Sequence, residues 1–224
     1  MADYDGVLLD HDGVLVALTD RSTLQETARG ALAAVGVTDP SRGDVEAITV
    51  RVSPDELGAV ADRHGVAPDR LWQARENWID RLMRDRARSG GKAPYGDVEA
   101  LTAVDRPLGV VSNNQTRIVE FLLEYHGLAE HFGTVRAREP TVESLSVKKP
   151  APTFLERAAA DLGCSTPLYV GDSESDVVAA HRAGFDSVFL RRDHNADRCL
   201  DADPTYDLSS LSAVVDLLEP SRTM

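Results

Sequence analysis

The sequence predicts an α/β protein: a doubly wound parallel sheet, covered by helices on both faces and interrupted by an α-helical insertion. Three observations lead to this prediction. Short apolar runs end in polar residues or glycine, which is typical of buried parallel strands. Amphipathic helical patterns lie between several of these runs. The stretch from 17 to 88, by contrast, shows helical patterning without a convincing buried strand.

Four segments are predicted to be strands, because each is a short apolar run that leads into a polar residue or a turn. They are residues 7–9, 108–111, 168–170 and 187–190. Helical spacing of apolar residues predicts helices around 118–123, 154–162 and 177–181. Ligands of such sheets bind at the carboxyl ends of the strands, so the residues that follow the strands are candidates for function.

The helical stretch is expected to form a cap, residues 17–88, inserted into a core made of residues 1–16 and 89–224. A helix start is predicted at Ser53, where a capping serine is followed by proline and, three residues after the cap, by glutamate. A second helix is expected to begin near Pro68. The chain returns to the core through the glycine-containing segment 89–94, which suggests a hinge.

The insertion also contains candidates for substrate recognition. Trp72 and Trp78 lie at helical spacing and are interpreted mainly as core residues, with a pocket lining as the alternative. Arg42 and Arg51 fall in the irregular part of the insertion, where they are interpreted mainly as solvated surface. Their alternative role is to bind a substrate carboxylate or a second phosphate.

Length and composition predict a soluble, globular protein. A chain of 224 residues with 42% hydrophobic residues can bury a full core. No apolar run approaches the length of a membrane span, and the amino-terminal residues are acidic rather than basic and apolar. Two cysteines, Cys164 and Cys199, have no partners at metal-ligand spacing and suit a reducing compartment. We therefore expect a cytoplasmic protein.

The charge is strongly acidic, since 37 acidic residues face 24 basic ones for a net charge of −13. Nucleic acid and anionic membranes are therefore not expected partners. The only lysines are Lys92, Lys148 and Lys149. An acidic surface poor in lysine is similar to proteins of salt-loving archaea, which favours a halophilic protein, with an ordinary acidic enzyme as the alternative.

Polar residues suited to one reaction follow three of the predicted strands. Asp10 and Asp12 follow the first strand, with Gly13 permitting a sharp turn. Ser112 and Asn113 follow the second. The third leads to the acidic segment 171–176, and the basic pair 148–149 precedes a predicted helix. An Asp-x-Asp-Gly sequence alone is often a turn or a fragment of a calcium loop, but acids gathered at adjoining strand ends would repel each other without a cation. Oxygen ligands favour Mg²⁺.

Two histidines near these residues are given structural interpretations. His11 lies between the two acids, and strand alternation predicts that its side chain points away from theirs. His126 lies at a predicted helix end, where a capping role is favoured.

These four motifs, in this order over about residues 5 to 192, resemble the haloacid dehalogenase superfamily. The resemblance is to its phosphatase branch, which has a Rossmann-like core and a helical cap inserted after the first motif. It implies that Asp10 is the nucleophile and Asp12 the general acid and base. It also implies that Ser112, the Asn113 backbone and Lys149 bind the phosphate, with Lys149 preferred over Lys148. The implied Mg²⁺ ligands are the Asp10 and Asp172 carboxylates and the Asp12 carbonyl, with Asp176 as a ligand or a neighbouring acceptor.

The expected function is Mg²⁺-dependent hydrolysis of a small phosphate ester through an aspartyl-phosphate. Asp12 can donate a proton only if it retains one near neutral pH, and we expect the neighbouring carboxylates to raise its pKa. Dehalogenating relatives lack this second aspartate, which makes carbon–halogen cleavage an unfavoured reaction. A phosphomutase similar to β-phosphoglucomutase and a non-catalytic binding protein are the alternatives. We expect a monomer or a weak homodimer.

Overall fold

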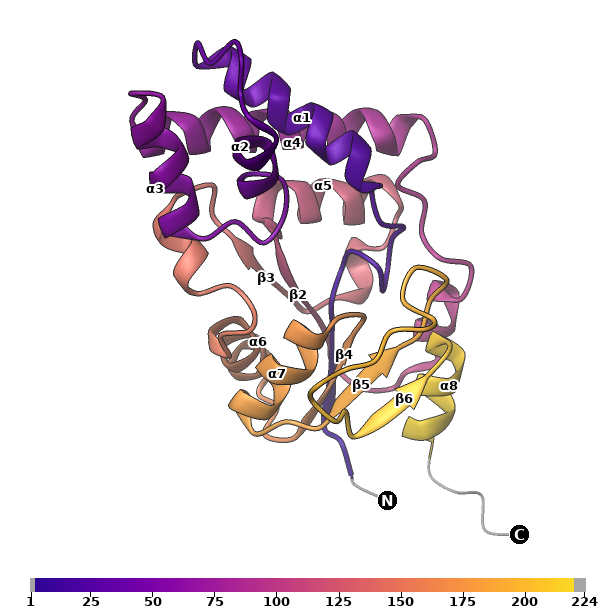
Figure 1. Cartoon of the computed structure of the whole chain (residues 1–224). Helices are drawn as coiled ribbons and strands as arrows, with labels where there is room; N and C mark the ends of the chain where they lie inside the picture. Colours follow the sequence, from indigo (N-terminus) through magenta and orange to yellow (C-terminus); the bar gives the residue numbers. More distant parts are fainter. Residues whose placement is uncertain (1–2, 220–224) are drawn as a thin grey trace, which may run out of the picture.

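The sheet has six strands, all of them parallel to their neighbours, in the order β3-β2-β1-β4-β5-β6. The structure is a computed structural model and describes residues 3–219. Figure 1 shows the sheet in the lower part of the molecule, with β1 and β4 at its centre. The strands are β1 (Gly6–Leu9), β2 (Leu108–Gln115), β3 (Thr134–Arg138), β4 (Pro167–Gly171), β5 (Ser187–Leu190) and β6 (Tyr206–Leu208).

Helices account for most of the remaining described chain. Four of them lie between β1 and β2, in the predicted insertion: α1 (Arg21–Ala34), α2 (Arg42–Ala47), α3 (Pro54–Arg63) and α4 (Pro68–Arg88). The others are α5 (Thr116–Tyr125), α6 (Thr153–Leu162), α7 (Glu174–Ala183) and α8 (Leu211–Leu218), with the short 3₁₀ helices η1 (Val98–Ala103), η2 (Ala129–His131) and η3 (Glu143–Ser146).

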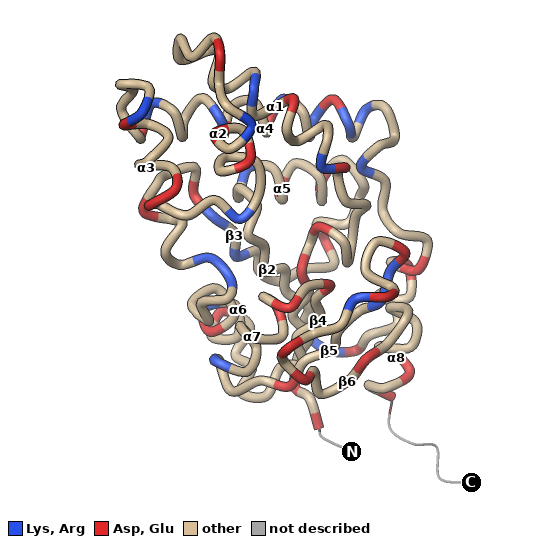
Figure 2. The backbone as a smooth tube through the Cα atoms, in the orientation of Figure 1, with Lys and Arg blue, Asp and Glu red and all other residues tan. Residues whose placement is uncertain are grey.

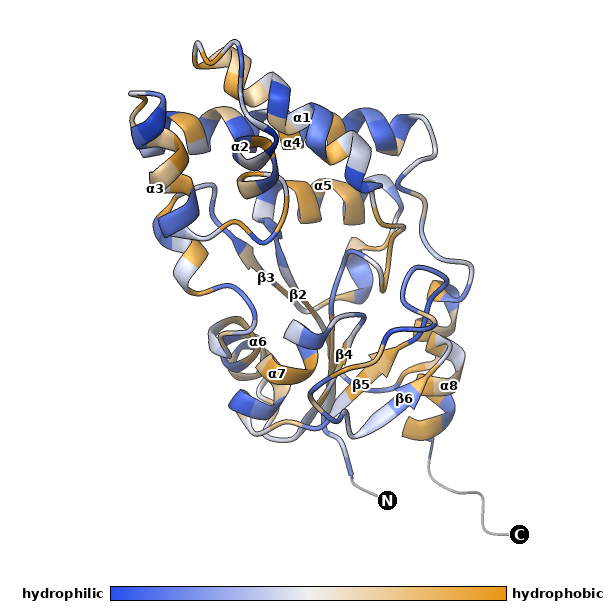
Figure 3. Ribbon diagram, viewed as in Figure 1, coloured by the Kyte–Doolittle hydropathy of each residue, from blue (hydrophilic) through white to orange (hydrophobic). Residues whose placement is uncertain are grey.

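Helices cover both faces of the sheet, because successive strand residues point to opposite sides. Val7 and Leu9 of β1 pack with α5, η1 and α8, whereas Leu8 packs with α6 and α7. Figure 3 shows hydrophobic positions on the strands and on these helices. This arrangement confirms the predicted Rossmann-like, doubly wound α/β fold.

The inserted helices share an apolar cluster that also includes Leu145 of η3. It joins residues of α1 to α4, including Leu32, Leu57 and Trp72. A second cluster joins Ile79 and Met83 of α4 to α5. The predicted helix starts are confirmed: α3 follows Ser53, which forms a reciprocal cap with Glu56, and α4 begins at Pro68. The division into a core and a cap at 17 and 88 stays a prediction.

The chain leaves and re-enters the sheet region through two segments that lie side by side. Ala17 N donates to Ala93 O at 3.0 Å, and Tyr95 N donates to Leu15 O at 3.0 Å. Val16 and Pro94 form an isolated antiparallel bridge. The two crossings are therefore tied to one another by backbone hydrogen bonds.

Two of the six strands, β3 and β6, were not predicted from the sequence. β3 and β6 occupy the edges of the sheet, and their side chains are mostly half-buried or exposed. Such strands lack the continuous apolar run by which the four inner segments were found. Within residues 3–219, no helix is long and apolar enough to cross a membrane.

Candidate active site at the strand ends

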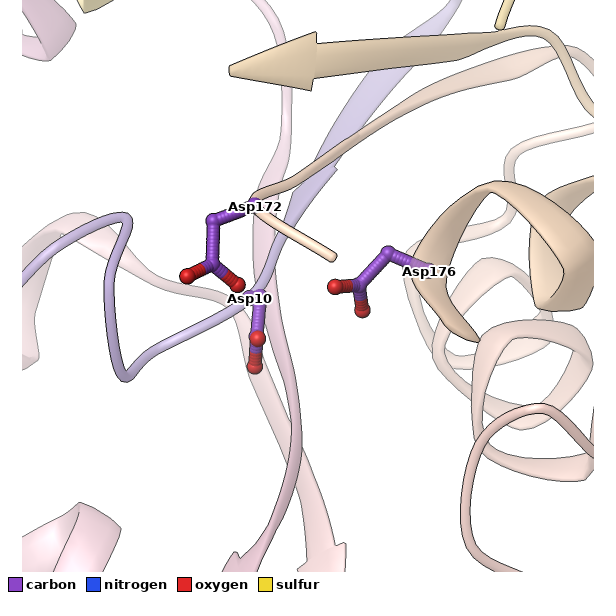
Figure 4. A group of neighbouring side chains, drawn as sticks. All are labelled: Asp10, Asp172 and Asp176. Carbon is purple, nitrogen blue, oxygen red and sulfur yellow. The ribbon is translucent and has the colours of Figure 1, made fainter. Parts of the chain in front are cut away.

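Three carboxylates meet at the carboxyl end of the sheet, two of them directly after neighbouring strands and the third on a helix (Figure 4). β1 and β4 are paired in register, with Leu9 opposite Val170, so Asp10 and Asp172 emerge next to each other. Asp176 comes from the first turn of α7. Each of the three offers a carboxylate oxygen, and these oxygens lie within 4.8 Å of one another. All three residues are buried.

Glycines allow this close approach. A Cβ atom on Gly13 would lie 2.0 Å from Asp172 Oδ2, and one on Gly171 would lie 2.2 Å from Asp176 Cβ. Gly13 also has a φ of +88°, in the region that favours glycine. The turn after β1 therefore excludes any larger residue at position 13.

Lys149 is the cation of the group. Its Nζ lies 2.8 Å from Asp10 Oδ1 and 2.8 Å from Asp176 Oδ1. It also donates to Tyr169 Oη at 2.8 Å and Val111 O at 3.1 Å. Three carboxylates and one ammonium leave two negative charges, which one divalent cation would balance. The preference for Lys149 over Lys148 as the partner of Asp10 agrees with this geometry.

The electrostatics of the acids also fit a cation. Burial raises the pKa of Asp10 well above its usual range, Asp176 and Asp172 raise it further, and Lys149 offsets part of this effect. Burial also raises the pKa of Asp172, with Asp176 adding to it and His194 opposing it. Buried carboxylates that repel one another are stabilised by a bound metal ion. The acids therefore fit the predicted Mg²⁺ site.

Residues in the last part of β2 hold the loop of Lys149 in place; they were expected to follow the strand, but β2 extends to Gln115. Asn113 Oδ1 accepts from Lys149 N at 2.7 Å, and Asn113 Nδ2 donates to Lys149 O at 3.0 Å. Since the amide is used in this way, phosphate binding by Asn113 would rely on its backbone N–H. Ser112 is buried, and its Oγ accepts from Asn114 N at 3.1 Å. The phosphate-binding roles of Ser112 and Asn113 stay predictions.

Asp12 points to a different neighbourhood. Lys92 Nζ donates to Asp12 Oδ1, and Asn114 Nδ2 donates to Asp12 Oδ2 at 2.9 Å. The Asp12 carboxylate does not belong to the group of Asp10, Asp172 and Asp176. Its predicted part in metal binding is through the backbone carbonyl, which stays a prediction.

The expected direction of the Asp12 pKa is wrong for this arrangement. Burial raises the pKa of Asp12, but the charge and hydrogen bond of Lys92 and the nearby imidazole of His11 lower it more, so it lies well below its usual range. The neighbouring carboxylates were expected to dominate, but a lysine 80 residues away in the sequence does so instead. Asp12 is therefore held as a carboxylate.

The expectation that His11 points away from both acids is also wrong. His11 is buried, and its Nδ1 lies 3.5 Å from Asp12 Oδ2. Regular alternation does not extend to position 11, because β1 ends at Leu9. His126 does follow the end of α5, but its ring nitrogen Nε2 pairs with Lys92 O at 2.8 Å rather than with the helix.

His194 is a site neighbour that sequence reasoning missed. Its Nε2 lies 2.6 Å from Asp172 Oδ2, and Asn195 Nδ2 donates to Asp172 O at 2.8 Å. Both residues lie in the loop between β5 and β6. They orient Asp172, but no spacing in the sequence relates them to it.

A cavity of about 610 Å³ lies between these strand ends and the inserted helices. Asp12, Asn113 and Lys149 line it from below, and residues 49–52, Trp72 and Met83 line it from the insertion. Of the tryptophans, Trp72 is buried and lines the cavity, whereas Trp78 is 37% exposed and packs over Gly30. Arg51 lines the cavity, and Arg42 lies at a separate depression with Arg21.

Comparison with known families gives one matching model, described as haloacid dehalogenase-like hydrolase, over residues 4–184. Among curated proteins, the phosphoglycolate phosphatase of Neisseria meningitidis is 30% identical over 171 residues. That match covers 72% of this chain and 71% of the relative.

Solved structures agree on the fold. The crystal structure of a predicted phosphoglycolate phosphatase from Haemophilus somnus matches with a TM-score of 0.70 and 20% identity, covering 98% of this chain and all of the other. CbbY from Rhodobacter sphaeroides, in complex with phosphate, matches with a TM-score of 0.68 and 20% identity over 94% and 96% of the two chains.

Proposed function

Because this chain belongs to the haloacid dehalogenase-like hydrolases, we propose that it is a Mg²⁺-dependent phosphatase of small phosphomonoesters that forms an aspartyl-phosphate on Asp10. One observation carries the proposal: a buried carboxylate at the end of β1 lies against an ammonium and two further acids. The curated relatives named as phosphatases support the reaction class. Carboxylates, amides and an ammonium group at the carboxyl ends of the strands suit phosphoryl transfer, because this reaction depends mainly on charges held in position.

Asp10, Asp172 and Asp176, with the Asp12 carbonyl, would hold the Mg²⁺. When bound, the ion supplies positive charge to the transferring phosphoryl group and to the attacking carboxylate. His194 and Asn195 orient Asp172, and Ser173 fixes Asp176 through its N–H and hydroxyl. Such neighbouring hydrogen bonds keep ligands in position.

The oxygen of Asp10 that attacks is Oδ2. Oδ1 accepts from His11 N at 2.7 Å and lies 2.8 Å from Lys149 Nζ, whereas Oδ2 has no hydrogen-bond donor among residues 3–219. Oδ2 forms a bond to phosphorus as the bond from phosphorus to the ester oxygen breaks. Lys149, Ser112 and the Asn113 N–H stabilise the charge on the other phosphoryl oxygens.

Asp12 moves the proton. In the first step it donates a proton to the departing ester oxygen, and in the second its carboxylate takes a proton from the water that attacks phosphorus. The bond between phosphorus and Asp10 then breaks, which releases phosphate. Since Lys92 holds Asp12 ionised in this structure, proton donation requires the Lys92 contact to open.

The proposal includes the division of the chain. Residues 1–16 and 89–224 form the catalytic core, and residues 17–88 form a cap that closes over the strand ends. The cavity between the two parts and the paired crossings at 15–17 and 93–95 support this assignment. We further propose that the protein acts in the cytoplasm as a monomer or weak homodimer.

Phosphate release from a panel of phosphomonoesters with Mg²⁺ tests the function. Asp10→Asn should abolish turnover, and mass spectrometry of the acid-quenched wild type should find a phosphoryl group on the peptide containing Asp10. Asp85→Asn, at an exposed acid of α4, is the matched control. Turnover retained in Asp10→Asn would remove the nucleophile assignment. Isomerisation of a hexose 1-phosphate without phosphate release would favour a mutase, and inactivity with the whole panel would favour a binding protein.

A further inference from the structure

The cavity carries positive charge although the chain as a whole is strongly acidic. Six basic and two acidic residues are among those that line it, whereas the chain has a net charge of −13. Figure 2 shows basic positions at the end of β3 and in the segment that follows it. Charge of one sign focused in a cleft attracts ligands of the opposite sign.

Two of the six cations are neutralised at the reaction centre. Lys92 pairs with Asp12, and Lys149 pairs with Asp10 and Asp176. These pairs belong to the machinery of phosphoryl transfer. Four cations remain in the part of the cavity lined by the insertion, by the end of β3 and by the segment that follows it: Arg51, Arg75, Arg138 and Lys148.

Arg75 and Arg138 share one acid. Glu76 is fully buried, with Oε1 2.5 Å from Arg75 Nη1 and Oε2 2.6 Å from Arg138 Nη2. Arg75 Nε donates to Ile48 O and Arg75 Nη2 donates to Thr49 O, and both guanidinium groups lie 4.9 Å from the centre of the Trp72 ring. This arrangement is rigid, and it has an excess of one positive charge.

Lys148 lines the cavity together with Arg75 and Arg138, but it forms no ion pair with an acidic residue of the described chain. Its Nζ donates to Val52 O, and within residues 3–219 it has neither an ion pair nor another hydrogen-bond acceptor. Two of its three N–H groups therefore have no protein partner. Burial, together with the charges of Arg138 and Arg75, lowers the pKa of Lys148 to about 8, which a bound anion would reverse.

The fourth cation, Arg51, lies in the loop between α2 and α3. It is the one residue other than glycine with positive φ in the described chain, at +56°, a conformation that side chains rarely adopt. Backbone strain of this kind persists where the surrounding structure fixes it, often at ligand sites. In the described part of the chain Arg51 has no ion pair, and it lines the cavity beside Val52.

We propose that Lys148 and Arg51 bind a second anionic group of the substrate, on its leaving-group side. The inference rests on the proposed phosphatase function and narrows its substrates to phosphomonoesters that carry a carboxylate or a further phosphate. The field of Arg75 and Arg138 reinforces the site, but all three nitrogens of each guanidinium group already donate to Glu76, to backbone carbonyls or to Ser144 Oγ. A cavity of about 610 Å³ has room for such a molecule.

Matched substrates test this proposal. The ratio of kcat/KM for 2-phosphoglycolate to that for its uncharged amide should be well above one in the wild type. Lys148→Met and Arg51→Gln should each lower this ratio roughly tenfold, the value of one charge-assisted hydrogen bond. Lys148→Arg should retain most of it. Arg42→Gln, which removes a basic residue of the insertion outside the cavity, should leave the ratio unchanged.

A second pair of substrates separates the two anions. If the second anionic group of the natural substrate is a phosphate, kcat/KM should instead be higher for propane-1,3-diol bisphosphate than for propyl phosphate. Equal kcat/KM values for the charged and uncharged members of both pairs would overturn the proposal. So would a Lys148→Met variant in which kcat/KM falls by the same factor for both members of a pair.

Calorimetry keeps this test apart from the hydrolase assay. If no ester is hydrolysed, the phosphatase proposal fails, but Mg²⁺-loaded protein can still be titrated with 3-phosphonopropionate and with its amide. Tenfold weaker binding of the acid alone in Lys148→Met would support the anion site. The same affinity for acid and amide in the wild type would exclude it.

Discussion

Lys92 donates a hydrogen bond to the carboxylate of Asp12 across 80 residues of sequence. Lys92 is buried and lies in the segment that returns from the inserted helices, and its Nζ also donates to Ala17 O at 2.8 Å on the outgoing segment. One ammonium group of the returning segment thus contacts the outgoing segment and the proposed acid and base. The ionisation of Asp12 is therefore coupled to the position of the crossings.

Removing either partner of this pair should have distinct effects. Asp12→Asn should lower kcat on the order of 100-fold or more, because proton transfer is lost. It should also lower the free energy of unfolding by about 3 kcal/mol, because Lys92 is left buried without its carboxylate. Steady-state kinetics and urea denaturation measure the two effects.

Lys92→Met should instead raise the pKa of Asp12 towards its ordinary value. The limb of the pH–rate profile that reports Asp12 should then move to higher pH relative to the wild type. Lys148→Met, which removes a different lysine at the cavity, is the comparison variant. An unchanged acidic limb in Lys92→Met would show that Lys92 does not control this ionisation.

Mg²⁺ should stabilise the folded chain, because it binds a site that the unfolded chain lacks. At one hundred times its dissociation constant, the gain is about 2.7 kcal/mol. Differential scanning calorimetry with and without Mg²⁺ measures it. In Asp172→Asn most of this gain should be lost, whereas Asp85→Asn should keep it. A wild-type melting temperature that is the same with and without Mg²⁺ would contradict the metal site.

Asp97 should make stability depend on pH outside the active site. It accepts from Arg192 at 2.8 and 2.9 Å and from Leu211 N at 2.8 Å, and so ties η1 to the start of α8. Burial raises the pKa of Asp97, but these hydrogen bonds lower it more. Its contribution is therefore present above the pKa of the unfolded chain, about 3.9, and is lost as pH falls through the folded value.

Asp97→Asn should accordingly lower the free energy of unfolding by about 2 kcal/mol at pH 7. The difference from the wild type should shrink below about pH 4, where the Asp97 carboxylate of the unfolded chain takes up a proton while that of the folded chain stays ionised. Denaturation at several pH values measures it. A difference that stays constant down to pH 3 would exclude the charge of Asp97 as its cause.

Glu76 should stabilise the contact between the insertion and the sheet edge. Its carboxylate joins Arg75 on α4 to Arg138 at the end of β3. Glu76→Gln leaves two buried guanidinium groups without their shared charge and should cost about 3 kcal/mol in urea denaturation. Asp85→Asn on the exposed side of the same helix should cost far less.

Salt should stabilise the protein if its acidic surface is an adaptation to high salt. At about 1 M salt, charges further apart than about 3 Å are screened, so repulsion among the surface carboxylates is reduced. The melting temperature should therefore rise between dilute buffer and molar potassium chloride. A lower or equal value in molar salt would end the halophile hypothesis.

The sequence alone determined the fold class, the four inner strands, the starts of α3 and α4, and the meeting of acids at the strand ends; the structure groups Asp10 and Asp172 with Asp176, and not with the carboxylate of Asp12. These features depend on local patterns: apolar runs, capping residues and the rule that parallel strands present their carboxyl ends at one edge. The comparisons confirm the family and the enzyme class that these motifs indicated.

Only the tertiary structure decided the partners of these residues. Three pairs join distant segments, and no period or spacing relates their members: Lys92 with Asp12, His194 with Asp172, and Arg138 with Glu76. The expected pKa of Asp12 was therefore wrong in direction. A pKa depends on the nearest charges in space, and packing alone selects which charges those are.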